Sequence, residues 1–167
     1  MTEVLLRRFR PEEAQAVNEL VFAAYAELAP DIPMWTEFQK GLGTLVDRAE
    51  QSEVIVAESA GRLVGAVGYV GPGQPKRDFF KPEWPIVRLL SVLPDCRGAG
   101  IGRLLVQRCV DRTVEDQAEL LALHTTPVVR AAQKLYAAFG FERIRDLPEM
   151  YGVPYSLFVK RLVPRLK

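Results

Sequence analysis

The stretch Ile86-Val87-Arg88-Leu89-Leu90-Ser91-Val92-Leu93-Pro94-Asp95-Cys96-Arg97-Gly98-Ala99-Gly100-Ile101 decides the fold of this chain. From Ile86 to Leu93 it is an apolar run of strand length, rich in branched side chains and broken only by Arg88 and Ser91. Pro94 ends the predicted strand because proline has no N–H to give to a sheet ladder. A glycine-rich loop follows, and behind it apolar residues recur at helical spacing. The stretch therefore predicts a buried strand, a turn, a glycine loop and a helix.

The glycine loop has the features of an anion site at the start of a helix. The first N–H groups of a helix have no internal partner and carry the positive end of its dipole. Gly98, Gly100 and Gly102 have no side chains, so a phosphate or pyrophosphate could approach these groups closely, with Arg97 as a mobile cation at the rim. The same glycines could instead serve only a tight turn, and their spacing does not choose between the two interpretations.

Two common nucleotide-binding motifs do not match this loop. A P-loop needs Lys and then Ser or Thr after its last glycine, whereas Gly102 is followed by Arg103 and Leu104. A dinucleotide fingerprint needs G-x-G-x-x-G, and Arg103 stands where its third glycine would be. A nucleotide-binding domain of either type is therefore disfavoured.

The segment Arg97-Gly98-Ala99-Gly100-Ile101-Gly102 closely resembles the acyl-CoA loop of the GCN5-related N-acetyltransferases, the GNAT family. The family pattern is Q/R-x-x-G-x-G/A, and Arg97, Gly100 and Gly102 fill its three fixed positions. Downstream, Leu135-Tyr136-Ala137-Ala138-Phe139-Gly140-Phe141 is similar to the family's L-Y-x-x-x-G-F segment. Two motifs in the family's order are much more specific than either alone.

The order of elements predicts an α/β fold with a mixed sheet. The turn signal Ala60-Gly61 joins two predicted strands, 53–58 and 62–70, which should pair antiparallel. A strand, a helix and a second strand over residues 86–124 favour parallel pairing with a right-handed crossover. We expect further strands at 4–9, 141–145 and 153–162, and helices at 11–30, 35–50 and from Thr126 to 139. Together they predict a single domain over residues 1–167, a central sheet flanked by helices; the resemblance adds a splayed strand four.

Composition excludes several classes of protein. Lys and Arg total 22 against 21 Asp and Glu, so nucleic-acid binding has no electrostatic support. No apolar run approaches the roughly 18 residues that suggest a membrane span. The first eight residues are too charged for a signal peptide, and two cysteines with one histidine make a metal site or a disulfide framework improbable. A cytoplasmic protein without a metal is expected.

The resemblance implies that acetyl-CoA is the co-substrate and that an amine attacks its thioester in a ternary complex. The glycine loop would bind the pyrophosphate, and main-chain groups of a bulged strand four would pair with the pantetheine arm and polarise the thioester carbonyl. The residues expected at acetyl-CoA are Leu90, Ser91, Val92, Arg97, Gly98, Ala99, Gly100, Ile101, Gly102 and Arg103.

Tyr136 is the catalytic residue that the resemblance implies, because many family members use the tyrosine of this segment to protonate the departing thiolate. The alternative is that Tyr136 only packs against the cofactor and donates a hydrogen bond to its sulfur. The chain departs from the family at Val129, where an asparagine is frequent; Thr125 or Thr126 could replace that contact.

No general base is assigned. Many relatives carry a glutamate on strand four, where this chain has Arg88 and Leu89. His124, the only histidine, has an ordinary pKa that suits a base at neutral pH, although a histidine at a strand end is often structural. The remaining candidates are Asp78, Glu83 and Glu149. Arg88 could hold a carboxylate or phosphate of the acceptor, or it could face solvent or a neighbouring acid.

Two loops are candidates for the border of an acceptor site. Residues 71–85 contain four prolines and three aromatic residues, and they form either a surface loop or a flap beside the acceptor. The predicted loop 146–152 could border the same site.

The leading hypothesis is transfer of an acetyl group to a primary amine, on a small amine, an amino acid derivative or a peptide N-terminus. The alternative is a non-catalytic acyl-CoA-binding regulatory module, because the strand-four acid is missing. The family often forms homodimers, but no sequence feature decides this, and the acceptor and the preferred acyl group stay open.

Overall fold

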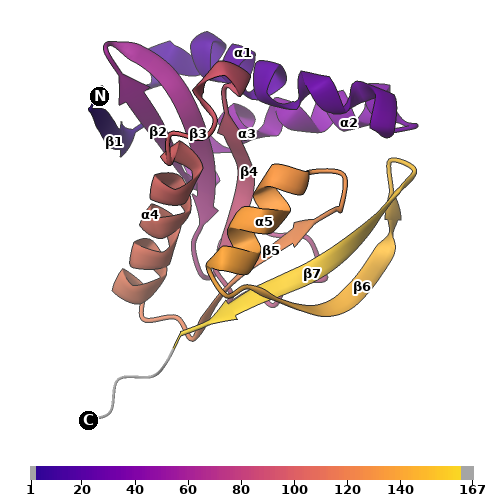
Figure 1. Cartoon of the computed structure of the whole chain (residues 1–167). Coiled ribbons are helices and arrows are strands. Elements are labelled where there is room, and N and C mark those ends of the chain that lie inside the picture. Colours follow the sequence, from indigo (N-terminus) through magenta and orange to yellow (C-terminus); the bar gives the residue numbers. More distant parts are fainter. Residues whose placement is uncertain (1–2, 163–167) are drawn as a thin grey trace.

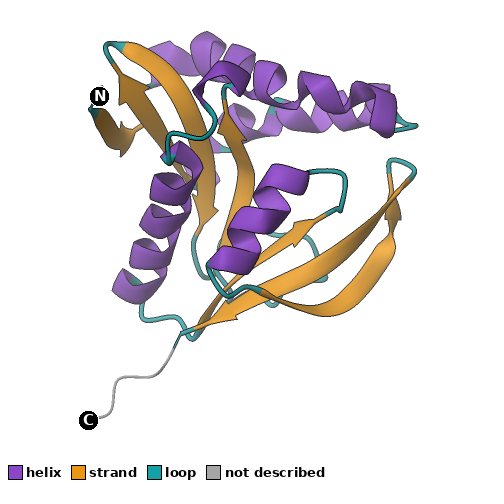
Figure 2. Ribbon diagram, in the orientation of Figure 1, coloured by secondary structure: helices purple, strands orange, loops and turns teal. Residues whose placement is uncertain are grey.

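The computed structural model describes residues 3–162 as one mixed sheet with helices on both of its faces (Figures 1 and 2). Within these residues the sheet has seven strands in the order β1-β2-β3-β4-β5-β7-β6. The strands are β1 Val4–Arg8, β2 Glu53–Ser59, β3 Arg62–Val70, β4 Ile86–Val92, β5 Leu120–Thr125, β6 Glu142–Met150 and β7 Val153–Arg161. The α-helices are α1 Ala14–Tyr25, α2 Trp35–Leu42, α3 Thr44–Asp47, α4 Ile101–Glu115 and α5 Arg130–Ala138. Short 3-10 turns lie at η1 Pro11–Glu13, η2 Ala26–Asp31, η3 Ala49–Gln51 and η4 Pro94–Cys96.

The sheet divides beside β4. β2 pairs antiparallel with β3, and β3 pairs antiparallel with β4. β4 and β5 are parallel, but they pair only at Ile86 and Ala122. Beyond that pair the two strands separate, so the main-chain groups of residues 89–92 on the β5 side have no strand to pair with. The predicted mixed α/β fold and its splayed strand four are confirmed.

A bulge in β4 accompanies this separation. Gly68 pairs with Arg88 and Ala66 with Ser91, so Val67 faces both Leu89 and Leu90. Leu89 has φ 49°, a left-handed conformation that is unusual for a leucine. One extra residue turns the strand and re-aims the main chain that follows it.

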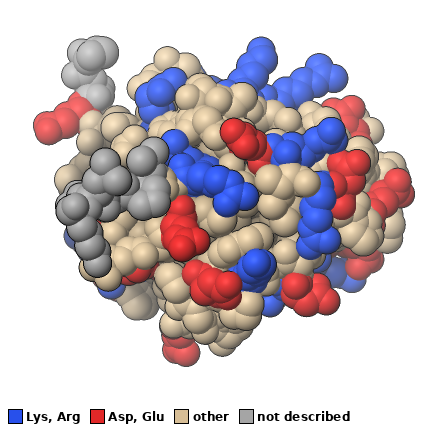
Figure 3. Space-filling view, turned by 90° about the horizontal axis from the view of Figure 1, so that it is seen from below, with Lys and Arg blue, Asp and Glu red and all other residues tan. Residues whose placement is uncertain are grey.

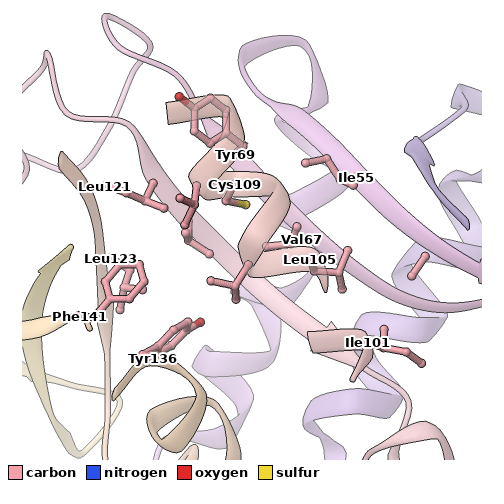
Figure 4. Packing of buried hydrophobic residues seen from close by; sticks show 14 of the residues in the cluster. Ile55, Val67, Tyr69, Ile101, Leu105, Cys109, Leu121, Leu123, Tyr136 and Phe141 are labelled. Carbon is pink, nitrogen blue, oxygen red and sulfur yellow. The ribbon is translucent and has the colours of Figure 1, made fainter. Parts of the chain in front are cut away.

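Alternation along the strands gives the sheet its two apolar faces. Ile55 of β2 packs on the side of α4, while Val54 and Val56 pack on the side of α1, α2 and α3. Figure 4 shows side chains of α4 lying over those of the sheet. A Cβ on Gly65 would lie 2.9 Å from Cγ2 of Ile101, so glycine occurs here because the helix crosses β3 closely.

Three predicted boundaries are wrong. The helix predicted at 35–50 is divided at Gly43 into α2, α3 and a 3-10 turn. Thr126 does not start α5; residues 126–129 form a turn in which the Val129 N–H donates to the Thr126 carbonyl at 3.2 Å, and the helix begins at Arg130. The predicted loop 146–152 is mostly strand, because β6 lies at the sheet edge, where Pro148 needs no second partner.

The turn between β6 and β7 has only two residues. Tyr151 and Gly152 have φ of 58° and 80°, as in the type I′ turns that suit twisted hairpins. Tyr151 is not a typical residue for this position. The turn docks onto the segment before α2, where the Met34 N–H donates to the Tyr151 carbonyl at 3.1 Å.

The surface carries both signs of charge. On the face seen in Figure 3, basic and acidic side chains are interspersed. Among residues 3–162, no helix has the length and apolar character needed to cross a membrane.

Candidate active site

An outer groove of about 800 Å³ lies where β4 ends and α4 begins. Its walls are the loop and first turn of α4, the start of α5 and the end of α1. Gly100 is the N-cap of α4 with φ 81°, and it lines the groove with Gly98 and Gly102. The positive end of the helix therefore opens onto the groove beside three glycines, which have no side chains to keep an anion away from the main-chain N–H groups.

Most of the predicted cofactor residues gather in this groove. Its lining includes Leu90, Val92, Arg97, Gly98, Gly100, Ile101, Gly102 and Arg103. Two do not reach it with their side chains: Ser91 is buried and donates its hydroxyl to the Leu89 carbonyl at 2.8 Å, and Ala99 is exposed outside the lining.

Arg97 is held rather than mobile. It forms an ion pair with Glu27 and donates to the Ala24 carbonyl at 2.8 Å, so it ties the glycine loop to the end of α1. Arg103 lies over the Phe139 ring at 5.6 Å, and Arg130 lines the opposite wall. Sequence reasoning missed Arg130, because its place became evident only once α5 was known to begin there.

An inner chamber of about 170 Å³ adjoins the groove. It lies among β4, the end of β5, α2 and α3, the 71–85 loop and the β6–β7 turn. Four residues line both spaces: Tyr25, Leu90, Val129 and Ala132. At this junction the Tyr25 hydroxyl donates to the Leu90 carbonyl at 2.7 Å. The groove and the chamber therefore meet at the β4 bulge.

Tyr136 lines the chamber and is 7% exposed. Its ring packs edge-on against Phe141 at 5.5 Å, and Figure 4 shows its hydroxyl directed away from Phe141. Burial raises the pKa of Tyr136 well above its ordinary value, so the phenol stays protonated at neutral pH and can act as a donor.

Positive charge gathers in the chamber lining. Arg88 is half-buried and donates to Thr44 Oγ1 at 2.7 Å, while Arg48 and Arg77 are exposed and line the same space. Burial, and then repulsion by Arg48 and Arg77, lowers the pKa of Arg88 to about 10. Within residues 3–162 no Asp or Glu belongs to this lining. Arg88 thus meets a hydroxyl rather than an acid.

The two segments that were candidates for the border of an acceptor site both border the chamber. Lys76, Arg77 and Phe80 of the 71–85 loop line it, as does Tyr151 of the β6–β7 turn. Lys76 is occupied in its own loop, where it donates to the Gly71 carbonyl at 2.7 Å. Arg77 reaches across to the Tyr151 hydroxyl at 3.5 Å, which joins the two segments over the chamber.

His124 does not have the pKa expected of a base at neutral pH. It lies at the end of β5 against Phe79, Phe80 and Tyr155, at ring distances of 5.2, 5.7 and 5.5 Å. Burial, and then the charges of Arg77 and Arg88, lowers the pKa of His124 to about 4. Asp78, Glu83 and Glu149 are absent from the chamber lining among the residues that the structure describes.

The histidine should make the protein less stable in mild acid. The unfolded chain binds a proton near pH 6.5 and the folded chain only near pH 4, so stability falls as pH drops through this window. We expect the free energy of unfolding to fall by about 2 kcal/mol between pH 7 and pH 5. Urea unfolding at both pH values measures this loss.

His124→Gln is the matched control for this pH effect. The chain has only one histidine. The ion-paired Glu13, whose pKa is lowered to about 2, loses its stabilising effect mainly below pH 4.5, outside this window. The substitution should flatten the dependence between pH 7 and pH 5. An equal slope in both proteins would contradict the assignment.

The geometry agrees with comparisons to known proteins. Residues 14–141 match the model of the acetyltransferase (GNAT) family. N-acetylaspartate synthetase of Danio rerio is 33% identical over 99 residues, which are 59% of this chain but only 32% of that protein. This chain thus spans about a third of its relative's length.

Solved structures share the fold. Ribosomal-protein-alanine N-acetyltransferase from Brucella melitensis superposes with a TM-score of 0.69 at 23% identity, covering 95% of this chain and 99% of that one. A GNAT family acetyltransferase from the same organism, in complex with acetyl-CoA, gives 0.65 at 21% identity, covering 99% and 92%. Because the family model matches residues 14–141, which are most of the chain, the chain belongs to the acetyltransferase (GNAT) family.

Proposed function

We propose that this protein transfers an acetyl group from acetyl-CoA to a primary amine by direct attack in a ternary complex. The observation that carries this proposal is the meeting of the outer groove and the inner chamber at the β4 bulge. The groove offers a helix N-terminus and the cations Arg103 and Arg130 to phosphates, and the chamber offers a separate space for an acceptor. The zebrafish relative's name, which describes synthesis of N-acetylaspartate, supports an amino group as the acceptor.

The transfer would occur at the junction of the two spaces. The nitrogen lone pair attacks the thioester carbon, an N–C bond forms, and the C–S bond breaks with its electron pair on sulfur. Main-chain donors of β4 left unpaired by β5 would stabilise the negative charge on the carbonyl oxygen. Tyr136 would give its proton to the sulfur and recover one from the nitrogen, so an amide and a free thiol remain.

The acceptor would lose its ammonium proton to solvent before the attack. Neither a carboxylate of the chamber lining nor a basic histidine is available for it within residues 3–162.

The protein would act as a single domain over residues 1–167. Its free thiols, Cys96 and Cys109, support a reducing compartment such as the cytoplasm.

Thermal unfolding with acetyl-CoA tests the cofactor. At a hundred times Kd, a ligand that binds only the folded state should raise Tm by roughly 5–10 °C in a domain of this size. ATP and NAD at equal concentration are the controls and should leave Tm unchanged. Free-thiol release with a panel of amines then tests transfer. Absence of a shift with acetyl-CoA would overturn the proposal, and a shift without thiol release from any amine would favour a non-catalytic acyl-CoA-binding module.

A further inference from the structure

The three arginines of the chamber have no carboxylate partner among residues 3–162, whereas several other arginines of the chain do. Arg7, Arg97 and Arg112, for example, each form ion pairs with Asp or Glu side chains. Within residues 3–162 no ion pair involves Arg48, Arg77 or Arg88. Three positive charges from three separate segments therefore converge on one space without an anion.

Arg88 makes this arrangement costly unless an anion arrives. It is half-buried, its one hydrogen-bond partner among residues 3–162 is the neutral hydroxyl of Thr44, and it is repelled by Arg48 and Arg77. A cation taken out of water is stabilised by a paired anion, and the planar guanidinium matches a carboxylate with two parallel hydrogen bonds. The chamber thus has the chemistry of an anion-binding pocket.

The size of the chamber limits what it takes. At about 170 Å³ it has room for about five or six waters, and it is smaller than the roughly 300 Å³ at which pockets for drug-sized ligands begin. A small molecule fits this space better than a folded protein surface.

Arg88 lies close to the junction of the two spaces. It is two residues before Leu90, which lines both the groove and the chamber. A small amine whose side-chain carboxylate is held by Arg88 would therefore place its amino group near this junction. Arg48 and Arg77, at the exposed side of the chamber, are then left for a second carboxylate.

From this geometry we propose that the acceptor is a small primary amine carrying two carboxylates, with Arg88 binding one of them and Arg48 and Arg77 binding the other. That the acceptor is an amine rests on the proposed acetyl transfer. That it carries two carboxylates is inferred from the chamber residues alone. Arg88 replaces a strand-four acid because its task is to hold the acceptor.

The experiment compares acids with their neutral amides. Calorimetry on the CoA-saturated protein and thiol release from acetyl-CoA are measured with L-aspartate, L-glutamate, L-asparagine, L-glutamine and O-phospho-L-serine. We expect kcat/KM for one dicarboxylate to exceed that for its amide by at least about tenfold. Arg88→Gln should lower kcat/KM for that dicarboxylate by about a hundredfold, mainly through KM, and leave the amide within about threefold.

Two further variants separate binding from folding. Arg88→Lys keeps the positive charge but not the planar guanidinium that donates two parallel hydrogen bonds to a carboxylate. It should therefore recover part of the affinity that Arg88→Gln loses. Arg161→Gln removes an exposed arginine at the far end of β7 and should leave every rate unchanged. Each variant must retain the Tm shift with acetyl-CoA, which shows that the fold and the groove are intact.

The outcomes distinguish the two proposals. Equal turnover of acids and amides would overturn the dicarboxylate acceptor and leave acetyl transfer standing. Arg88-dependent binding of a dicarboxylate without any thiol release would overturn acetyl transfer and uphold the anion pocket. Absence of binding by either dicarboxylate, or tighter binding of O-phospho-L-serine, would overturn the inference.

Discussion

Tyr136→Phe is expected to lower kcat for acetyl transfer by about a hundredfold and to leave Kd for acetyl-CoA within about threefold. The ring fills a buried position beside Phe141, and phenylalanine keeps that packing. Only the hydroxyl is lost, and with it the proton donor to the departing sulfur. Steady-state rates of thiol release and calorimetric titration with acetyl-CoA measure the two quantities.

Tyr69→Phe is the matched control for losing a tyrosine hydroxyl. Tyr69 is buried, lies outside both the groove and the chamber, and donates to Asp116 at 2.7 Å. Its variant should lose some stability, by about 1 kcal/mol, without a change in kcat. If Tyr136→Phe keeps kcat within about threefold of the original enzyme, Tyr136 only packs in the site and does not protonate the thiolate.

Leu105→Ala is expected to lower the free energy of unfolding by about 2–5 kcal/mol. Leu105 of α4 is 0% exposed, and its side chain packs against β3. A Cβ on Gly65 of β3 would lie only 3.0 Å from its Cδ1. Truncation leaves a cavity that the close packing of helix and strand cannot fill. Urea unfolding with an unchanged m-value measures the loss as a lower midpoint.

The neighbouring leucine gives a control of the same chemistry. Leu104 is on the same helix and 42% exposed, so Leu104→Ala should change the free energy of unfolding by less than about 0.5 kcal/mol. Similar losses in the two variants would contradict the packing of α4 on β3. Because α4 presents the glycine loop to the groove, Leu105→Ala should also lower the temperature up to which acetyl-CoA binds.

Sequence reasoning succeeded where the cause was local. β4, the glycine loop and α4 follow one another within about thirty residues, and each follows from hydrogen bonding and backbone freedom in its own segment. Gly100 has the positive φ that a residue with a side chain rarely adopts, so its place at the start of the helix was readable in advance. The splayed strand four came from family resemblance rather than from periodicity.

Sequence reasoning failed where distant segments decide the outcome. The ion pair of Arg97 with Glu27 joins residues that are far apart in the sequence, so the sequence did not reveal it. The β6 strand continues through Pro148 because of its edge position, and edge positions follow from the order of strands in the sheet. The lowered pKa of His124 comes from burial and from arginines on two other segments.

The sequence alone therefore determined the α/β fold, the family and the glycine-rich start of α4, because these depend on patterns within short stretches of chain. Only the tertiary structure decided the character of the chamber. The chamber is lined by Arg48, Arg77 and Arg88, which lie apart in the sequence, and none of them alone indicates an anion pocket. The fold brings all three to one space whose lining has no acid among the described residues. Burial and Coulomb interactions act through space, so the chemistry of the chamber exists only once the sheet, helices and loops have packed around it.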